Sequence, residues 1–499
     1  MPAMYPRHPG AANPIRGKLG ARMNPLLTLS GTKLASMIRS REVTSREVVD
    51  AHIRHIEAVN PALNAVVAHR FDAARLDARE ADRRLAAADP DLGPLHGVPC
   101  TIKESFALQG MPWSAGLVAR RSLRATRDAT GVERLRHAGA IPLGVTNVSE
   151  LCMWMESNNY VYGRTNNPYD LTRTVGGSSG GEGAIIGAGG SPFGLGADIG
   201  GSIRMPAFFN GVFGHKPTGG LVDNGGQFPM AAEAASRYLT TGPLTRRAED
   251  LAPLLAILAG TPIADPAQVD LAGLEVVSVE GDGRMAVTDD LLRAQRAAAD
   301  ALAARGARVR TATVAGLSQS IEIWSAMLDA AEGPSFSSLL GEGTEISALR
   351  ELGRWILGRS PHTLPALALA LVEKLPKLMP SQGRRAIAAG AALRRALVEL
   401  LGPRVIMLYP SHTRPAPRHH HAMFPPFGWA YTAIFNMMEL PVTQAPLGLD
   451  AEGIPLGVQI VGAHGADHVT IAVALELERA FGGWVPPRLA TDQQARSSR

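Results

Sequence analysis

Two serines set in glycine are the residues of this 499-residue chain best suited to nucleophilic chemistry. Ser178 lies in Gly-Gly-Ser-Ser-Gly-Gly, and Ser202 follows 24 positions later in Asp-Ile-Gly-Gly-Ser-Ile-Arg. Glycine has no Cβ atom, so such a backbone can turn tightly and direct several N–H groups at one point. An oxyanion formed by attack on a carbonyl needs those donors. The N–H groups of Ile199, Gly200, Gly201 and Ser202 are therefore the candidate oxyanion hole, with Ser202 as the nucleophile.

A lysine provides a candidate base for this attack. Only six of the 50 basic residues are lysines, and they stand at positions 18, 33, 103, 216, 374 and 377. Arginine keeps its proton under ordinary conditions, whereas a desolvated lysine can become a neutral amine. Lys103 ends the apolar, strand-like run Leu-His-Gly-Val-Pro-Cys-Thr-Ile-Lys, which indicates a position that needs a deprotonatable amine. A chance lysine at the end of a strand is the alternative interpretation.

Other interpretations of the glycine runs compete with this one. Residues 176–180 match the G-x-S-x-G elbow of α/β-hydrolases, which would make Ser178 the nucleophile with His464 or His468 as its base. That elbow follows a strand directly, whereas residues 166–174 read as a polar loop. A glycine-rich packing region with incidental serines is a further alternative, and two such runs at this spacing argue against it.

With these motifs the chain resembles the amidase signature family of serine hydrolases. The resemblance implies a Ser-Ser-Lys triad in which Ser202 attacks, Ser178 bridges and Lys103 is the base, with a cis peptide at the bridging serine. Segments 242–252 and 453–462 also fit the family.

Within that family, the motif Gly-Gly-Glu-Gly followed by Asp-Ile-Gly-Gly-Ser is most similar to the motifs of fatty-acid-amide hydrolases, especially the second mammalian type. The resemblance implies hydrolysis of a linear carboxylic amide, which could be a fatty-acyl amide, through an acyl-enzyme and without metal or organic cofactor. The glutaminyl-tRNA amidotransferase A-type subunit is the alternative, although it usually reads Asp-Thr-Gly-Gly-Ser.

The composition limits the partners. The net charge is +5, but the basic residues are scattered among 45 acidic ones, so a nucleic-acid partner is not expected. Two cysteines are too few for a disulfide framework, and the N-terminus lacks the apolar core of a signal peptide. No apolar run reaches the ~20 residues of a spanning helix. We expect a cytoplasmic protein that meets membranes only peripherally, and a homodimer is a further option.

Helical and strand patterns alternate along the chain, which predicts an α/β fold. Thr44 to Glu47 form a capping box before a helix that we expect to end at Asn60-Pro61. Further helices are expected at 71–88, 131–138, 249–260, 289–304 and 470–481, and strands at 140–146, 274–279, 307–310, 435–441 and 457–461. The resemblance implies one mixed, twisted sheet covered by helices on both faces.

One large domain, residues 24–488, is expected between a disordered arm at 1–23 and a disordered tail at 489–499. Met23 is an alternative start of the protein. Within the domain, Asp198, Arg204 and Lys216 are expected to fix the loops around the site.

Two further segments concern the substrate. Cys152, Met153 and Met155 precede the serines and are candidates to line an acyl pocket, although apolar residues are more often plain core. Segment 361–385 is apolar and ends in basic residues, so it predicts an interfacial helical cap with Leu367, Leu371 and Leu375 on one exposed face. An ordinary packed helix is equally compatible with it. The run Arg418 to His421 lacks a second ligand group at metal spacing, so no metal site is expected.

Overall fold

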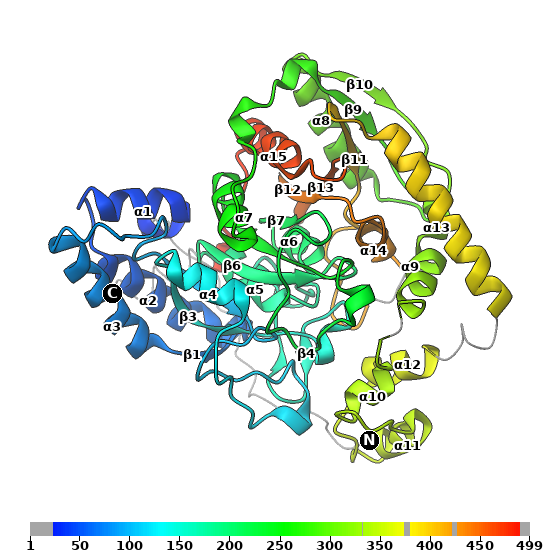
Figure 1. The fold of residues 1–499 in the computed structure, drawn as a ribbon, viewed down its shortest axis with the longest axis horizontal. Coiled ribbons are helices and arrows are strands. Elements are labelled where there is room, and N and C mark those ends of the chain that lie inside the picture. Colours follow the sequence, from blue (N-terminus) through cyan, green and yellow to red (C-terminus); the bar gives the residue numbers. More distant parts are fainter. Residues whose placement is uncertain (1–22, 332, 374–379, 422–426, 490–499) are drawn as a thin grey trace.

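A single mixed sheet forms the centre of the protein (Figure 1). The computed structural model describes residues 23–331, 333–373, 380–421 and 427–489. The sheet has eleven strands in the order β1 (Val66–His69), β3 (Ile141–Thr146), β2 (Pro99–Lys103), β6 (Phe193–Asp198), β8 (Thr240–Thr245), β7 (Phe213–Lys216), β12 (Val442–Leu449), β13 (Pro455–Val461), β11 (Val405–Tyr409), β9 (Glu275–Ser278) and β10 (Arg308–Thr311). Strands β4 (Asn158–Asn159) and β5 (Gly163–Arg164) pair separately.

The sheet joins two parallel groups through an antiparallel middle. Strands β3, β2 and β6 are parallel to one another, and so are β11, β9 and β10. Between them, β6, β8, β7, β12, β13 and β11 pair antiparallel in succession. The prediction of a mixed α/β sheet is confirmed.

Fifteen α-helices lie among the residues that the structure describes. They are α1 (Gly31–Arg39), α2 (Ser45–Leu63), α3 (Phe71–Ala86), α4 (Thr130–His137), α5 (Gly180–Gly187), α6 (Arg204–Phe209), α7 (Leu251–Ala259), α8 (Asp289–Ala304), α9 (Ser320–Asp329), α10 (Phe336–Leu340), α11 (Ala348–Ile356), α12 (Leu364–Val372), α13 (Pro380–Leu400), α14 (Ala430–Met437) and α15 (Asp467–Phe481).

Strand β6 shows how helices come to cover both faces of the sheet. Successive side chains of a strand point to opposite faces. The bulky residues Phe193 and Leu195 pack in the core cluster that contains the leucines of α7. The alternate residue Gly194 faces α5 instead, where an added Cβ would lie only 1.8 Å from Glu182 Oε2. The glycines of β6 therefore let α5 pack directly onto the strand.

Several local predictions hold, and two need correction. The capping box of Thr44 and Glu47 begins α2 as expected. The helix continues past Pro61 to Leu63, because proline removes only its own N–H and the Asn64 N–H still donates to the Asn60 carbonyl oxygen at 2.7 Å. The strand expected at 435–441 is wrong, because α14 extends to Met437 and β12 begins only at Val442. A short buried apolar run does not distinguish a helix from a strand by its pattern.

The domain boundaries also differ slightly from the expectation. Residues 1–22 and 490–499 lie outside the described part of the chain, so the disordered arm and tail stay predictions. Met23, by contrast, is buried in a core cluster, and Leu489 packs against the same cluster. Both residues therefore belong to the folded domain.

Helices α10, α11 and α12 form a lobe beside the sheet, at the lower right of Figure 1. The predicted exposed leucine face at 361–385 is wrong for Leu367, which is fully buried. Leu371 is half-buried and packs against a cluster that contains Phe336 of α10. Leu375, Lys374 and Lys377 lie outside the described residues. The inner face of α12 packs on α10 because its Ala366 and Ala370 allow a close approach.

Over the described ranges, no helix combines the length and the apolar character needed to span a membrane.

Candidate active site

Three elements bring the predicted triad together at one edge of the sheet. Lys103 is the last residue of β2, and the parallel neighbour β6 ends at Asp198, four positions before Ser202. Carboxyl ends of parallel strands meet at the same sheet edge. Helix α5 precedes β6 and begins at this edge, so that Ser178 lies two residues before its first turn. The order of strands thus places Lys103, Ser178 and Ser202 on one cavity.

Lys103 is buried and contacts Ser178 directly. The residue is 1 % exposed, and Nζ lies 2.7 Å from Ser178 Oγ and 3.4 Å from the Ala197 carbonyl oxygen. Burial lowers the pKa of Lys103, while the negative charge of Asp198 opposes that shift. An amine with a lowered pKa is neutral in a larger fraction of molecules near pH 7. The geometry therefore offers a proton acceptor next to Ser178.

Ser178 stands in an unusual backbone setting. The peptide bond between Gly177 and Ser178 is cis, as the resemblance implied. The hydroxyl of Ser157 holds this loop, because it donates toward the carbonyls of Gly176 (3.1 Å) and Ser178 (3.3 Å) and accepts from the N–H of Gly180 (3.0 Å). Sequence reasoning gave Ser157 no role, and its only signal was its position in the segment that leads to the serines.

The two glycine runs contact each other through their backbones. The Ser179 N–H donates to the Ser202 carbonyl oxygen at 3.2 Å. Ser202 is half-buried and lines the cavity with Lys103 and Ser178. The loop that carries Ser202 is thereby fixed to the start of α5.

Asp198 and Arg204 fix the loop from its other side, as predicted. Asp198 accepts from the N–H groups of Gly201 (2.7 Å) and Ile203 (3.0 Å) and pairs with the Arg204 guanidinium, and both side chains are fully buried. Burial alone would raise the pKa of Asp198, but the charge and hydrogen bonds of Arg204 lower it well below its usual range. Asp198 is therefore a permanent carboxylate that organises the loop. Lys216, at the end of β7, donates from Nζ to the carbonyl oxygen of the adjacent Pro217 at 2.8 Å.

The candidate oxyanion donors are not equivalent. The Gly201 N–H already donates to Asp198, so it is engaged inside the protein. Gly201 has φ of 115°, and an added Cβ would lie 1.9 Å from Thr432 Oγ1, which explains the glycine at this position. Within the described ranges, no protein group accepts from the N–H of Ile199, Gly200 or Ser202. Of the four candidate donors, these three therefore have no acceptor within the described part of the protein.

The cavity at the triad has a volume of about 720 Å³. Such a volume suits a small-molecule ligand. Its wall combines the loop at 151–155 with side chains of α9, α10 and α12, and most of these side chains are apolar. The candidates Cys152, Met153 and Met155 all line it, together with Leu151, Trp154, Phe228, Met230, Trp324, Leu328, Phe336, Leu339, Leu369, Val372, Phe427 and Trp429.

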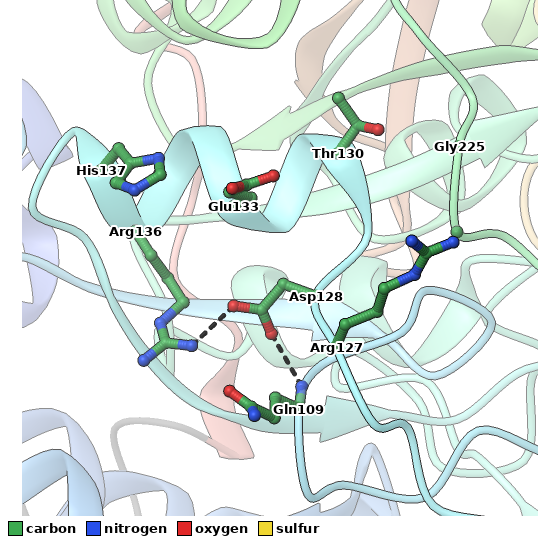
Figure 2. A pocket seen from close by; sticks show the side chains of 9 residues that line it. Gln109, Arg127, Asp128, Thr130, Glu133, Arg136, His137 and Gly225 are labelled. Carbon is green, nitrogen blue, oxygen red and sulfur yellow. Dashed lines mark hydrogen bonds and ion pairs between the residues drawn. The ribbon is translucent and has the colours of Figure 1, made fainter.

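A second cavity of about 750 Å³ lies around α4 and shares no lining residue with the first. Figure 2 shows Asp128 there between Arg136, at 2.6 Å, and the Gln109 N–H, at 2.7 Å. Its other side chains include Arg127, Glu133 and His137. Asp128 and Arg136 form an ion pair in this cavity, and no serine, cysteine or lysine is among its lining residues.

The remaining sequence alternatives find less support in the geometry. No strand directly precedes Ser178 in the described chain, and neither His464 nor His468 lines the cavity at the triad. No group of three or more His, Cys, Asp or Glu side chains suited to a metal occurs among the described residues. Instead, the backbone N–H of His420 donates to Glu156, and His419 Nδ1 lies 3.5 Å from the same carboxylate.

Comparisons with known proteins identify the family of the chain. Residues 47–471 match the family model described as Amidase. The chain is 49% identical to fatty-acid amide hydrolase 2-A of Danio rerio over 94% of this chain and 91% of that protein. It is 47% identical to fatty-acid amide hydrolase 2 of Homo sapiens, with 93% and 91% covered. A crystal structure of a bacterial aryl acylamidase of the amidase signature family superposes with a TM-score of 0.78 at 25% identity, covering 95% of this chain and 100% of that one. This chain belongs to the amidase signature family.

Proposed function

We propose that the chain hydrolyses carboxylic amides to an acid and an amine or ammonia, with Ser202 as nucleophile, Ser178 as bridge and Lys103 as base. One observation carries this proposal. The buried Nζ of Lys103 lies 2.7 Å from Ser178 Oγ, on the cavity that Ser202 lines. The family membership and the names of the similar proteins support amide hydrolysis as the reaction.

The proposed reaction begins with proton transfer. Neutral Lys103 takes the proton of Ser178 as Ser178 takes that of Ser202, and Ser202 Oγ attacks the amide carbon. The oxyanion binds the N–H groups of Ile199, Gly200 and Ser202. Return of the proton through the same relay lets the amine leave. Water then attacks the acyl-enzyme by the same route and releases the acid.

The apolar lining of the cavity favours an apolar acyl group. Leucine, methionine, phenylalanine and tryptophan side chains dominate a wall that extends from Ser202 to α12. Burial of apolar surface contributes about 25 cal/mol per Å², so each methylene in this cavity adds to the affinity. We therefore propose that long acyl amides are better substrates than acetamide-sized ones, as the names of the similar hydrolases also indicate.

Labelling with a serine-directed fluorophosphonate tests the nucleophile. We expect Ser202→Ala to abolish labelling and amide hydrolysis while its thermal unfolding matches that of the unaltered protein. The adjacent Ser179→Ala is the matched control and should still be labelled. If Ser178→Ala abolishes labelling and Ser202→Ala does not, the elbow alternative replaces this proposal.

A panel of acyl amides of increasing chain length tests the substrate class. We expect kcat/KM to rise with chain length until the cavity is filled. If the purified chain hydrolyses these amides without a partner protein, the amidotransferase-subunit alternative is also excluded, because such a subunit passes ammonia to a partner. Equal rates for all chain lengths would contradict the fatty-acyl part of the proposal only.

We also propose a peripheral membrane contact, now through α11. Leu349, Ile356 and Leu357 are each more than two-thirds exposed, and Arg350 and Arg359 flank them. An apolar face beside basic groups fits an anionic lipid surface. Replacing the three apolar residues by serine should reduce sedimentation with anionic vesicles and leave hydrolysis of short amides unchanged. Unchanged sedimentation would contradict this contact. The homodimer and the cytoplasmic location stay predictions.

A further inference from the structure

Two consecutive peptide groups of the loop before Ser202 are held by side chains from distant helices. The carbonyl oxygen of Ile199 accepts from Trp324 Nε1 at 2.9 Å. The carbonyl oxygen of Gly200 accepts from Thr432 Oγ1 at 2.9 Å, sharing that hydroxyl with the Trp429 carbonyl oxygen at 2.8 Å. The N–H of the same peptide, that of Gly201, donates to Asp198. The second peptide is therefore engaged at both ends.

The first peptide is engaged only at its carbonyl end. The bond between Ile199 and Gly200 is trans, so its C=O and N–H point in opposite directions. A donor that fixes the Ile199 carbonyl therefore also fixes the direction of the Gly200 N–H. Over the described part of the chain this N–H has no protein acceptor, and Gly200 lies between two residues that line the cavity, Ile199 and Ser202.

Trp324 is itself held in place by packing. It lies on α9, and its ring meets Trp429 edge to face, with 4.9 Å between ring centroids and an interplanar angle of 83°. A Cβ added to Gly200 would lie 3.6 Å from Trp324 Cζ2, in ordinary contact, so the indole packs against the loop. Both tryptophans also line the cavity, but the indole N–H of Trp429 has no acceptor among the described residues.

We propose that Trp324 is a positioning residue of the amidase reaction: its indole N–H orients the peptide between Ile199 and Gly200 so that the Gly200 N–H points at the oxyanion of the tetrahedral intermediate. This inference rests on the proposed function. The oxyanion needs donors that are oriented before the charge develops, because reorientation during the reaction adds to the barrier. Trp324 acts through the peptide and not on the substrate oxygen.

The substitution Trp324→Phe removes the N–H and keeps an aromatic ring. Its matched control is Trp484→Phe, because the indole N–H of Trp484 also donates to a backbone carbonyl oxygen, that of Gly187 at 2.8 Å, and Trp484 does not line the cavity. Loss of a whole oxyanion donor costs about 10²- to 10³-fold in kcat, so loss of its orientation should cost about tenfold. We expect kcat of Trp324→Phe to fall about tenfold with KM changed less than about twofold, whereas kcat of Trp484→Phe stays within about twofold.

A trifluoromethyl ketone, which forms a tetrahedral adduct with a nucleophilic serine, separates positioning from packing. For Trp324→Phe its inhibition constant should rise by the same factor by which kcat/KM falls, because both report transition-state binding. A rise in KM alone, or equal losses in both variants, would overturn the proposal. If the unaltered protein hydrolyses no amide, the proposed function itself fails. Comparison of the unaltered protein with Ser202→Ala separates that failure from a failure of the inference about Trp324.

A measurement on the unaltered protein keeps the test independent of how the variant folds. The indole ¹⁵N–¹H resonance of Trp324 should move downfield when the ketone adduct forms, since charge on the oxyanion polarises the peptide to which both groups bind. The resonance of Trp429 should move less. A Trp324 resonance that does not respond to the adduct would overturn the proposal.

Discussion

At the scale of single residues, two buried lysines show how position changes the chemistry of one side chain. Lys103 and Lys216 are both almost completely buried, and burial lowers the pKa of each. Lys103 contacts a serine hydroxyl, whereas Lys216 contacts a backbone carbonyl oxygen. The same loss of hydration thus has different consequences at the two positions. At Lys103 it can serve proton transfer, whereas at Lys216 it only makes the stability of the protein depend on pH.

The proton-accepting role of Lys103 predicts that arginine cannot replace it. Lys103→Arg should lose at least about 10²-fold in kcat/KM at pH 7, close to the loss in Lys103→Ala, because a permanent cation takes up no proton. In the unaltered enzyme kcat/KM should rise with pH through the lowered pKa of Lys103. Profiles from pH 5 to 10 check both points, with the exposed Lys33→Arg as control. Substantial recovery in Lys103→Arg would show that this position supplies only charge.

Lys216 predicts a pH-dependent stability. Burial, followed by repulsion from Arg204, lowers the pKa of Lys216 from 10.5 to about 7. Between these values the unfolded chain binds a proton that the folded protein does not, so the free energy of unfolding rises with pH. Relative to Lys216→Met, the unaltered protein should gain about 2 kcal/mol from pH 7 to pH 9 in denaturant titrations. The exposed Lys33→Met should show no such trend, and a constant difference for Lys216→Met would contradict the pKa shift.

At the scale of elements, the cavity depends on how the lobe of α10 to α12 is attached to the sheet. Glu150 precedes the cavity loop and accepts from the Thr363 N–H at 2.8 Å and from His362 Nδ1 at 2.9 Å. Glu373, at the other end of α12, accepts from the N–H groups of Phe336 (2.6 Å) and Ser337 (3.1 Å) at the start of α10. Two buried or half-buried carboxylates therefore connect the loop, α12 and α10.

Removal of the first of these connections should loosen the lobe. In Glu150→Ala the buried donors of His362 and Thr363 lose their acceptor, at a cost of about 1–3 kcal/mol for each unsatisfied group. We expect faster proteolysis within residues 333–373 and a higher KM for long acyl amides than for short ones. Glu399→Ala, on the exposed face of α13, is the control. An unchanged cleavage rate would show that apolar packing alone holds the lobe.

At the scale of the whole molecule, Arg204 joins segments that are far apart in the sequence. Its guanidinium donates to Asp198 (2.9 Å), to the carbonyl oxygen of Thr432 (2.7 Å), to Asn436 Oδ1 (2.6 Å) and to Gln459 Oε1 (2.9 Å). These partners lie on β6, α14 and β13, so one side chain connects the active-site loop to the second half of the sheet.

Loss of this connection should destabilise the fold as well as the site. Arg204→Met would leave the buried Asp198 without a counter-charge, which costs about 3–5 kcal/mol. Thermal and denaturant unfolding should show this loss, whereas Arg308→Met on the exposed edge strand β10 should change the free energy of unfolding by less than about 0.5 kcal/mol. A small effect of Arg204→Met would mean that Asp198 can take up a proton in the folded protein.

The sequence by itself determined the features that depend on local chemistry. The glycine runs, the lysine at position 103 in a strand-like run and the capping box of Thr44 and Glu47 are patterns of neighbouring residues. The mixed sheet was implied by the resemblance to the family. Alternation of helices and strands predicted the α/β fold, because each pattern has its own period. For the same reason the strand expected at 435–441 failed, since a buried run such as that in α14 has no distinguishing period.

Tertiary structure decided the features that depend on distant partners. Trp324 and Thr432 reach the loop before Ser202 across 125 and 232 positions, and no local pattern reports such a contact. Likewise, only the fold shows that Gly201 donates to Asp198 and that Leu367 faces the interior. A glycine or a leucine is written the same way in the sequence whether it faces a substrate, a carboxylate or the core. Its surroundings come from chain segments far away in the sequence.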